Sequence, residues 1–351
     1  MAFIRMDETV NTEYLEKLKF ALIGAKKSSR YIDICLEYAK RLLANNLPVI
    51  FDKQHLALVI GMNLKDLTSF IVIDEKYLYR SIKIPKKLGG YREISVPIFD
   101  LKYLQRWILD NILDNMQPSQ YATGFIKKRS IVDNATNHVG ANYLLNLDLR
   151  NFFPTITFQS VFRLFFYYGY TKEVSYTLAK LCTHEGKLPQ GSPASPAISN
   201  LVCLKLDERL SRLASSFSIN YSRYADDMTF SGERGFREFF PLVEKIIIEE
   251  GFAINDKKTR IAGKHQRQEI TGLIINDGKP RVSKIYKRKL QQEIYYCKKF
   301  GVISHMERVG QTKRFYREHL YGKAYFVKMV EPTVGANFLR ELDSLSWEGY
   351  L

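Results

Sequence analysis

Two adjacent aspartates, Asp226 and Asp227, interrupt an aromatic and apolar stretch that reads RYADDMTFSG from Arg223 to Gly232. Aspartate favours tight turns, so the pair could be no more than the tip of a β-hairpin. Neighbouring carboxylates also suit hard divalent cations, which take oxygen ligands and borrow further ones from elsewhere in the fold. If the pair binds metal ions, we expect a third carboxylate on a neighbouring strand.

Asp148 is a candidate for that third carboxylate. It lies in the run YLLNLDLRNFFP, where alternation predicts a strand with leucines on one face and polar side chains on the other. An aspartate on a solvent-facing strand would be ordinary, whereas a buried one is costly unless it is paired or binds a metal. The two faces hold Leu145, Leu147 and Leu149 on one side and Asn146 and Asp148 on the other.

Several other elements must position these carboxylates. The stretch LYRSIKIPKKLGGYREISVP (78–97) predicts a basic β-hairpin, and residues 1–60 read as mostly helical. Ser130 and Asp133 form a capping-box pattern at a helix start, and LPQGSPASPAISNL (188–201) reads as a loop that enters a helix. The helical apolar positions are Leu101, Leu104, Ile108 and Ile112 after the hairpin, and Leu206, Leu210 and Leu213 after the loop.

The charge of the chain favours a polyanionic partner. Its 351 residues include 53 Lys and Arg against 37 Asp and Glu, a formal net charge of +16, which attracts nucleic acid. A membrane surface would suit that charge too, but no apolar run approaches a membrane span and the N-terminus lacks a signal-peptide core, so we expect a cytoplasmic protein without a membrane partner. The cysteines, expected to be reduced and mostly buried, are Cys35, Cys182, Cys203 and Cys297.

The order of these segments, from about Lys83 to Asn276, resembles the polymerase blocks of reverse transcriptases, with YADD at the position of the family's metal-binding box. The sequence is similar in particular to the bacterial retron type. NATNH (134–138) fits the Asn-Ala-x-x-His motif of retron enzymes. ITG (270–272) stands where they usually carry Val-Thr-Gly.

The resemblance implies a polymerase that uses two Mg²⁺ ions. In two-metal phosphoryl transfer, closely spaced carboxylates hold two cations that stabilise the attacking and leaving oxygens. One ion would activate the primer hydroxyl and the other would neutralise the triphosphate. The implied metal ligands are Asp148, Leu149, Asp226 and Asp227.

Basic residues are implied on the triphosphate side. Arg92 matches the family's triphosphate-clamping arginine. Lys86 or Lys87 could help it, or these lysines could simply be solvated. Lys258 stands where a lysine can protonate the leaving pyrophosphate, although Lys257 is an equally basic neighbour.

Aromatic and polar residues are implied around the incoming deoxynucleoside triphosphate. Phe153 takes the position of the family's steric gate, whose ring leaves no room for a 2′-hydroxyl. Either Phe152 or Phe153 could instead belong to the core. Gln190 matches the residue that contacts the incoming nucleotide, and Tyr224 of YADD is placed in the same set.

RNA-binding residues are implied in three places. Asn134 and His138 lie one helical turn apart and share a face, where the family match favours contact with RNA or with the palm over a solvated surface. Thr271 and Gly272 of the ITG segment form the second place. From about residue 277 the chain becomes basic and aromatic, as a thumb that grips duplex phosphates would be. Its candidate residues are Lys284, Lys287 and Arg288.

The expected fold is an α+β right-hand polymerase with fingers, an antiparallel palm sheet, a helical thumb and an N-terminal helical extension. The segments are 1–60 for the extension, 61–120 and 157–187 for the fingers, 121–156 and 188–276 for the palm, and 277–351 for the thumb. Because only 75 residues follow Asn276, we expect no RNase H module beside the thumb.

These expectations describe the RNA-directed DNA polymerase of a retron. It would copy a structured noncoding RNA from a guanosine 2′-hydroxyl into branched, RNA-linked single-stranded DNA (msDNA). Host RNase H would remove the template, and an effector protein encoded nearby would act with it in antiphage defence. The alternatives are another bacterial reverse transcriptase, of the group II intron or abortive-infection type, and an RNA-binding scaffold whose polymerase site is unused. The intact carboxylates argue against the scaffold.

Overall fold

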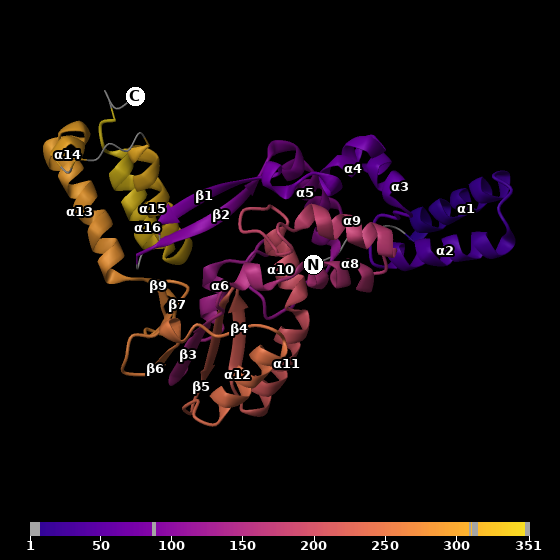
Figure 1. The fold of residues 1–351 in the computed structure, drawn as a ribbon. Coiled ribbons are helices and arrows are strands. Elements are labelled where there is room, and N and C mark those ends of the chain that lie inside the picture. Colours follow the sequence, from indigo (N-terminus) through magenta and orange to yellow (C-terminus); the bar gives the residue numbers. More distant parts are fainter. Residues whose placement is uncertain (1–7, 86–88, 309, 311–314, 348–351) are drawn as a thin grey trace. The chain divides into compact units, whose positions relative to one another are not determined.

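The computed structural model describes residues 8–85, 89–308, 310 and 315–347, which are drawn in colour in Figure 1. The chain forms two compact units. The first consists of Met1–Ile126, Leu149–Leu210 and Leu242–Ile254, and the second of Lys127–Asp148, Ser211–Pro241 and Asn255–Leu351. Each unit is therefore assembled from three separate stretches of chain. The six-segment division into extension, fingers, palm and thumb stays a prediction.

Helices and short antiparallel sheets make up both units. The helices are α1 (Glu8–Gly24), α2 (Ser29–Ala44), α3 (Lys53–Ile60), α4 (Leu64–Val72), η1 (Glu75–Tyr77), α5 (Phe99–Asn111), η2 (Leu113–Asn115), α6 (Ile131–Thr136), α7 (Phe152–Thr155), α8 (Phe158–Tyr167), α9 (Lys172–Cys182), α10 (Ser195–Val202), α11 (Leu204–Ser216), α12 (Phe239–Glu249), η3 (Asp256–Lys258), α13 (Lys284–Phe300), α14 (Val302–Arg308), α15 (Tyr316–Val330) and α16 (Pro332–Asp343). The strands are β1 (Tyr79–Pro85), β2 (Tyr91–Pro97), β3 (Tyr143–Asp148), β4 (Asn220–Tyr224), β5 (Asp227–Gly232), β6 (Arg260–Gly263), β7 (Glu269–Ile270), β8 (Leu273–Ile274) and β9 (Arg281–Val282).

The first unit begins with the helices that the sequence predicts. In α2 the buried residues recur at helical spacing, which makes one face of the helix apolar, and Ser28 caps its N-terminus. The helix after the hairpin is α5, and its expected apolar residues are all buried. These are Leu101, Leu104, Ile108 and, at its C-cap, Ile112.

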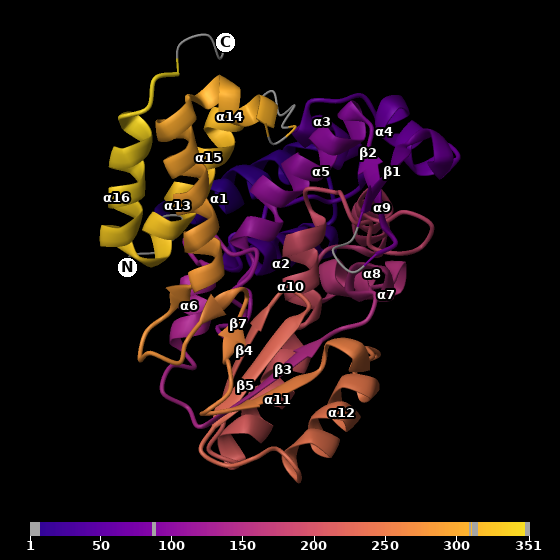
Figure 2. The ribbon, with the colours of Figure 1, turned by 90° about the vertical axis from the view of Figure 1, so that its left-hand side faces the viewer.

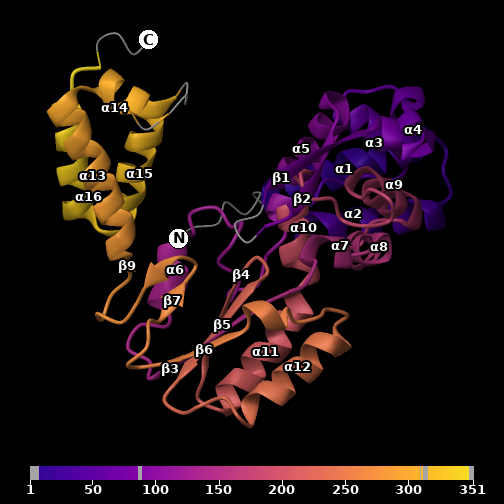
Figure 3. The same cartoon turned by 60° about the vertical axis from the view of Figure 1, so that its left-hand side comes forward.

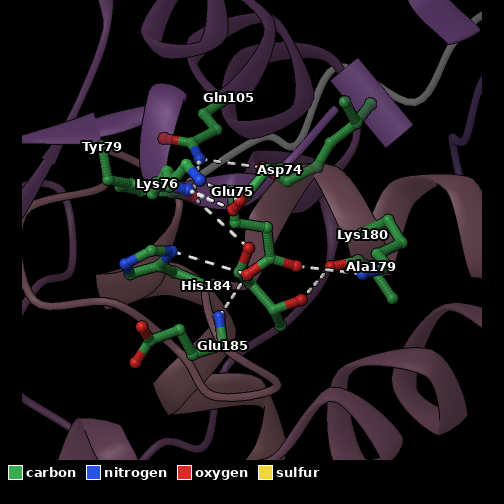
Figure 4. A network of polar contacts seen from close by, with 11 residues as sticks. Asp74, Glu75, Lys76, Tyr79, Gln105, Ala179, Lys180, His184 and Glu185 are labelled. Carbon is green, nitrogen blue, oxygen red and sulfur yellow. Dashed lines mark hydrogen bonds and ion pairs between the residues drawn. The ribbon is translucent and has the colours of Figure 1, made fainter. Parts of the chain in front are cut away.

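β1 and β2 form the predicted hairpin, and a polar network ties its root to α9 (Figure 4). Glu75 accepts a hydrogen bond from the ammonium of Lys180 at 2.9 Å and another from the backbone N–H of Glu185. The ring of Tyr79, the first residue of β1, stacks on His184 with 4.1 Å between centroids. The base of the hairpin is therefore fixed by charge and stacking, while the remaining residues of β1 are exposed.

The second unit is built on a four-stranded antiparallel sheet in the order β4-β5-β3-β6, and three of these strands, β3, β4 and β5, are labelled in Figure 2. Its alternation is the predicted one: Leu145 and Leu147 are buried on one face, and Asn146 hydrogen-bonds to Thr229 on the other. α6 packs against β4, with the expected capping box between Ser130 and Asp133. The polar ends of β3 and β5 are therefore presented on the face that α6 partly covers.

The C-terminal part of the second unit is a helical layer in which α13, α15 and α16 lie side by side (Figure 3). Its core includes Leu290 and Leu320, and it continues into Ile270 of the small β7-β8-β9 sheet and Leu144 and Ala262 of the four-stranded sheet. The sheet and the helical layer therefore share one hydrophobic core.

The four cysteines are free and buried, as predicted. Within the described residues, no helix on its own combines the length and apolar character needed to cross a membrane, and α3 and α4 do so only as a pair bent by 112°.

Candidate active site in the four-stranded sheet

The three predicted carboxylates come from one sheet and one turn of the second unit. Asp148 is the last residue of β3 and pairs in register with Asp227, the first residue of β5. Asp226 belongs to the turn that joins β4 to β5. Asp148 is 4% exposed, so its charge is held within the protein. The metal hypothesis required a third carboxylate on a neighbouring strand, and the structure places it there.

The turn that carries Asp226 is a two-residue hairpin loop. Tyr224 and Asp227 are paired across the hairpin, which leaves Ala225 and Asp226 between the strands. Ala225 has a φ of 58°, in the left-handed region, where hairpin turns usually place glycine. Tyr224, predicted to bind substrate, is half-buried opposite Asp227.

Asn255, the N-cap of η3, and Lys258, its last residue, fix Asp148. The side-chain N–H of Asn255 donates to Oδ1 of Asp148 at 2.9 Å, and Nζ of Lys258 lies 2.6 Å from Oδ2. The backbone N–H of Asn255 also donates to the Asp148 carbonyl at 2.8 Å. Of the two lysines that the sequence left open, Lys258 is the one that reaches the carboxylates. Asn255 was missed, because its sequence signal is only its place beside the lysine pair.

The carboxylates perturb one another electrostatically. Asp227 reaches solvent, yet the protein packed around its base desolvates the carboxyl, and Asp226 and Asp148 add negative charge, so its pKa rises to about 7 even though Lys258 opposes the shift. Desolvation would lower the pKa of Lys258, but its hydrogen bond to Asp148 and the charges of all three aspartates outweigh this and raise it. The cluster thus holds more negative charge than one lysine neutralises.

This donor set fits divalent cations. Hard cations prefer carboxylate oxygens, and excess negative charge near a buried carboxylate is what a cation would relieve. As the side chains stand, no three His, Cys, Asp or Glu residues among the described ones converge on a single metal position. The residues that would hold the ions are Asp148, Asp226 and Asp227, whereas Leu149 has a buried side chain and could offer only its carbonyl.

Apart from Tyr224, the predicted nucleotide-binding residues that the structure describes lie in the first unit. Arg92 is exposed on β2, paired with Ile84 across the hairpin. Gln190 is half-buried in the loop before α10, and its neighbour Gly191 touches β2 so closely that a Cβ there would lie 2.6 Å from the Ser95 carbonyl oxygen. The loop and the hairpin are therefore in direct backbone contact. Lys86 and Lys87 lie outside the described residues.

The two candidate gate phenylalanines differ in burial. Phe152 is 3% exposed and stacks on Phe252 with 5.9 Å between centroids, so it belongs to the core. Phe153 is half-buried, with its ring 6.1 Å from that of Phe125. Of the pair, Phe153 is the ring that a ligand could reach, and its role as a steric gate stays a prediction.

The assignment of Asn134 and His138 to direct RNA contact is corrected by the structure, because both side chains are fully buried. The hydroxyl of Ser222 donates to Oδ1 of Asn134 at 2.6 Å and lies 2.7 Å from Nε2 of His138. Nδ1 of His138 lies 2.7 Å from the Ser231 hydroxyl. The Ser222 hydroxyl therefore bridges Asn134 and His138, and the Ser231 hydroxyl contacts the other ring nitrogen. Together these contacts fasten α6 and the residues after it to β4 and β5.

Of the candidate RNA-binding residues on α13, two are exposed and one is held in an ion pair. Lys284 and Arg288 are exposed on α13. Lys287 is not available to RNA in the same way, because its ammonium contacts both carboxylate oxygens of Glu331 at 2.8 and 2.9 Å. Glu331 is 9% exposed and also accepts from the Val282 backbone, so the lysine neutralises a buried carboxylate. Lys287 therefore belongs to the architecture of the helical layer.

Thr271 and Gly272 form the two-residue turn between β7 and β8, with φ of 45° and 87°. A β-branched residue at positive φ is rare because its side chain crowds the backbone. The Thr271 hydroxyl is buried and has no hydrogen-bond partner among the described residues. RNA contact by this turn stays a prediction.

The family model and the curated relatives that match this chain are all reverse transcriptases. The family described as reverse transcriptase (RNA-dependent DNA polymerase) matches residues 84–275. The chain is 36% identical over 275 residues to the Retron Ec86 reverse transcriptase of Escherichia coli, covering 73% of this chain and 85% of that protein. It is 34% identical over 344 residues to the Retron Mx162 reverse transcriptase of Myxococcus xanthus, covering 87% and 69%. Among solved structures, C-terminally truncated apo telomerase from Candida tropicalis aligns with a TM-score of 0.43 and 14% identity, covering 63% of this chain and 61% of that one.

The family match spans more than half of the chain, and the retron enzymes match it at 34–36% identity over most of their length. The predicted α+β polymerase fold is confirmed, and the chain belongs to the bacterial retron-type reverse transcriptases.

Proposed function

We propose that this chain synthesises DNA on a structured noncoding RNA, starting from a guanosine 2′-hydroxyl within that RNA, and leaves a branched, RNA-linked single-stranded DNA. The family supports RNA-directed DNA polymerisation with divalent metal ions. The observation that carries the proposal is the meeting of Asp148, Asp226 and Asp227 at one end of the sheet, with Lys258 against Asp148.

Mg²⁺, when bound by these carboxylates, would lower the pKa of the attacking hydroxyl and neutralise the triphosphate. The hydroxyl oxygen forms a bond to the α-phosphorus, its proton leaves to water, and the bond to the pyrophosphate oxygen breaks. Lys258, which Asp148 orients, gives a proton to the departing pyrophosphate and is recharged from solvent. Asn255 holds Asp148 in the orientation that presents its carboxylate. Arg92 clamps the triphosphate and Phe153 excludes the 2′-hydroxyl of a ribonucleotide.

The first test removes a carboxylate. Asp226→Asn and Asp227→Asn should each reduce extension of an annealed primer by at least about 100-fold, because a dication site loses a charged ligand. RNA affinity, measured by filter binding, should stay within about twofold, since it rests on basic surfaces elsewhere. Asp277→Asn, an exposed change outside the cluster, is the matched control and should keep wild-type extension. Near-wild-type synthesis by either cluster variant would exclude the assigned site.

The second test concerns the retron-specific part of the proposal. Nucleic acid that co-purifies with the chain should contain one RNA species joined to DNA through a 2′–5′ linkage, which sequencing before and after debranching would reveal. An intron RNA would favour the group II type, and RNA without attached DNA, combined with failure to extend a primer, would favour a binding scaffold. We also propose that host RNase H removes the template and that an effector protein encoded nearby acts with the product in antiphage defence.

A further inference from the structure

Arg223 is a charged residue in an apolar place. It lies on β4 and is 0% exposed, among the largest fully buried side chains of the described residues. Its neighbour across the hairpin is Met228, which pairs in turn with Leu147 of β3. All three lie on the buried, leucine-bearing face of the sheet, opposite the face of Asp148 and Asp227. Strand alternation alone would place an aliphatic residue here.

A buried guanidinium is costly unless its donors are satisfied, so its presence calls for a reason. One of its donors reaches forward two residues: Nη1 of Arg223 donates to the carbonyl oxygen of Ala225 at 3.1 Å. The acceptor is therefore in the turn itself, between the strand and the two aspartates. A methionine or leucine could fill the same space but could not make this bond.

Ala225 is the residue of that turn that needs restraint. Its φ of 58° is a conformation that alanine adopts only at a cost, because Cβ crowds the backbone there, whereas glycine adopts it freely. Asp226 and Asp227 follow directly, so any relaxation of Ala225 redirects the peptide planes on which both carboxylates depend. The bond from Arg223 opposes that relaxation from the buried side of the sheet.

We propose that Arg223 is a positioning residue of the polymerase: its buried guanidinium holds the Ala225 carbonyl, keeps the left-handed turn in place and so sets the direction of Asp226 and Asp227. The proposal rests on the assignment of these aspartates to the metal site. It gives the arginine of RYADD a role distinct from that of the carboxylates, because Arg223 is fully buried on the opposite face of the sheet.

The test uses substitutions that separate the bond from the bulk of the side chain. Arg223→Met keeps most of the volume and removes the donors, and Arg223→Lys keeps the charge and loses the planar fork. Ala225→Gly removes the strain that the bond opposes. Arg209→Met, which removes the arginine that pairs with Glu249 and Glu250, is the matched control for the loss of an arginine outside the turn.

Two readouts do not depend on catalysis. Hydrogen exchange of the 224–228 amides should be about tenfold faster in Arg223→Met and unchanged in Arg209→Met. The Mn²⁺ concentration for half-saturation, followed by electron paramagnetic resonance without nucleotide, should rise about tenfold in Arg223→Met. The double variant Arg223→Met/Ala225→Gly should recover most of both effects, because glycine holds the turn without the bond.

The double variant Arg223→Met/Ala225→Gly distinguishes positioning of the turn from packing of the sheet. A role limited to packing the sheet would leave the double variant as impaired as Arg223→Met, and unchanged exchange at 224–228 in Arg223→Met would also overturn the proposal. If Arg223→Met does not fold, Arg223→Lys with and without Ala225→Gly gives the same comparison. Failure of the proposed function would be seen separately, as a wild-type chain that binds Mn²⁺ at this turn but extends no primer, or that binds none.

Discussion

At the scale of single residues, Asp148 is predicted from the sequence and is placed beside its partners by the structure. It is predictable because alternation in YLLNLDLRN separates it from the leucines, and this reasoning is local. Its partners are not predictable in the same way, since Asn255 is 107 residues away in sequence and lies beside Asp148 where the chain approaches β6, the strand that pairs with β3. The shared face of Asn134 and His138 was a correct inference, but sequence could not say that the sheet covers that face.

The half-buried ring of Phe153 leads to a prediction about sugar choice. Phe153→Ala should raise ribonucleotide relative to deoxynucleotide incorporation by about 10- to 100-fold, because excluded volume opens near the sugar. Single-nucleotide extension with matched dNTP and rNTP measures this ratio. Phe152→Leu, a change in the buried neighbour, should lower stability and leave the ratio unaltered. Unchanged discrimination in Phe153→Ala would assign the ring to packing.

His138 leads to a prediction about pH. Burial lowers its pKa from 6.5 to about 4, so the unfolded chain binds a proton more readily than the folded one between these values. The contribution of His138 to stability is complete above about pH 6.5 and is lost as the pH falls toward 4, by up to about 3 kcal/mol. Urea unfolding at several pH values measures this loss.

The matched variants for this pH prediction are His138→Gln and His265→Gln, since His265 is exposed. The first should have a smaller fall in stability between pH 6.5 and 4 than the wild type, and the second should keep the wild-type fall. Equal slopes in all three proteins would mean that His138 does not carry the effect.

At the scale of elements, the helices and strands whose sequences carry a local pattern can be predicted. The β1–β2 hairpin, the strand β3, the apolar face of α5 and the capping box of α6 each follow from a repeating pattern or a pair of residues close in sequence. The two-residue strands β7, β8 and β9 carry no such pattern, because their pairing depends on a shared core. The same holds for the ion pair of Lys287, whose partner lies at the junction of α15 and α16.

The contact between the Gly191 loop and β2 gives an element-scale prediction. Gly191 has a φ of 131°, and an added Cβ would lie 2.6 Å from a carbonyl oxygen of β2, so Gly191→Ala must displace either the loop or the hairpin. We expect primer extension to fall at least about tenfold through weaker nucleotide binding, seen as a raised KM. Gly186→Ala is the control, since its φ of 70° is also left-handed but nothing lies within 4 Å. If both variants behave alike, backbone strain and not the contact is responsible.

At the scale of the whole molecule, the helical layer is not an appended module. Its core runs without interruption into Ile270, Leu144 and Ala262, so a boundary at residue 277 cuts through packed side chains. Composition marks the basic and aromatic change near that residue, and this is why the sequence placed the thumb there. The continuity of the core could not be seen from composition.

This continuity refines a prediction about RNA choice. Replacing residues 277–351 by the matching segment of a related retron enzyme should redirect self-primed synthesis to the donor's RNA, because exposed cations such as Lys284 and Arg288 move with it. The chimera should still extend a generic annealed primer, although its free energy of unfolding should be lower than that of the wild type. A second chimera that also exchanges Ile270, Leu144 and Ala262 should regain that stability. One gel that compares branched product with generic extension reads both; a chimera that keeps the original RNA preference would place recognition elsewhere.

The interleaving of the two units has a consequence for how the protein is made. Asp148 leaves the ribosome 107 residues before Asn255 and 110 before Lys258. At translation rates of about 5 to 20 residues per second, the nascent chain carries its buried carboxylate without these partners for roughly 5 to 20 s. The sheet closes only when β6 has been synthesised, after the chain has twice passed through the other unit. The carboxylate cluster therefore cannot be complete before residues 255–263 have been synthesised, and we expect no primer extension by nascent chains that end before them.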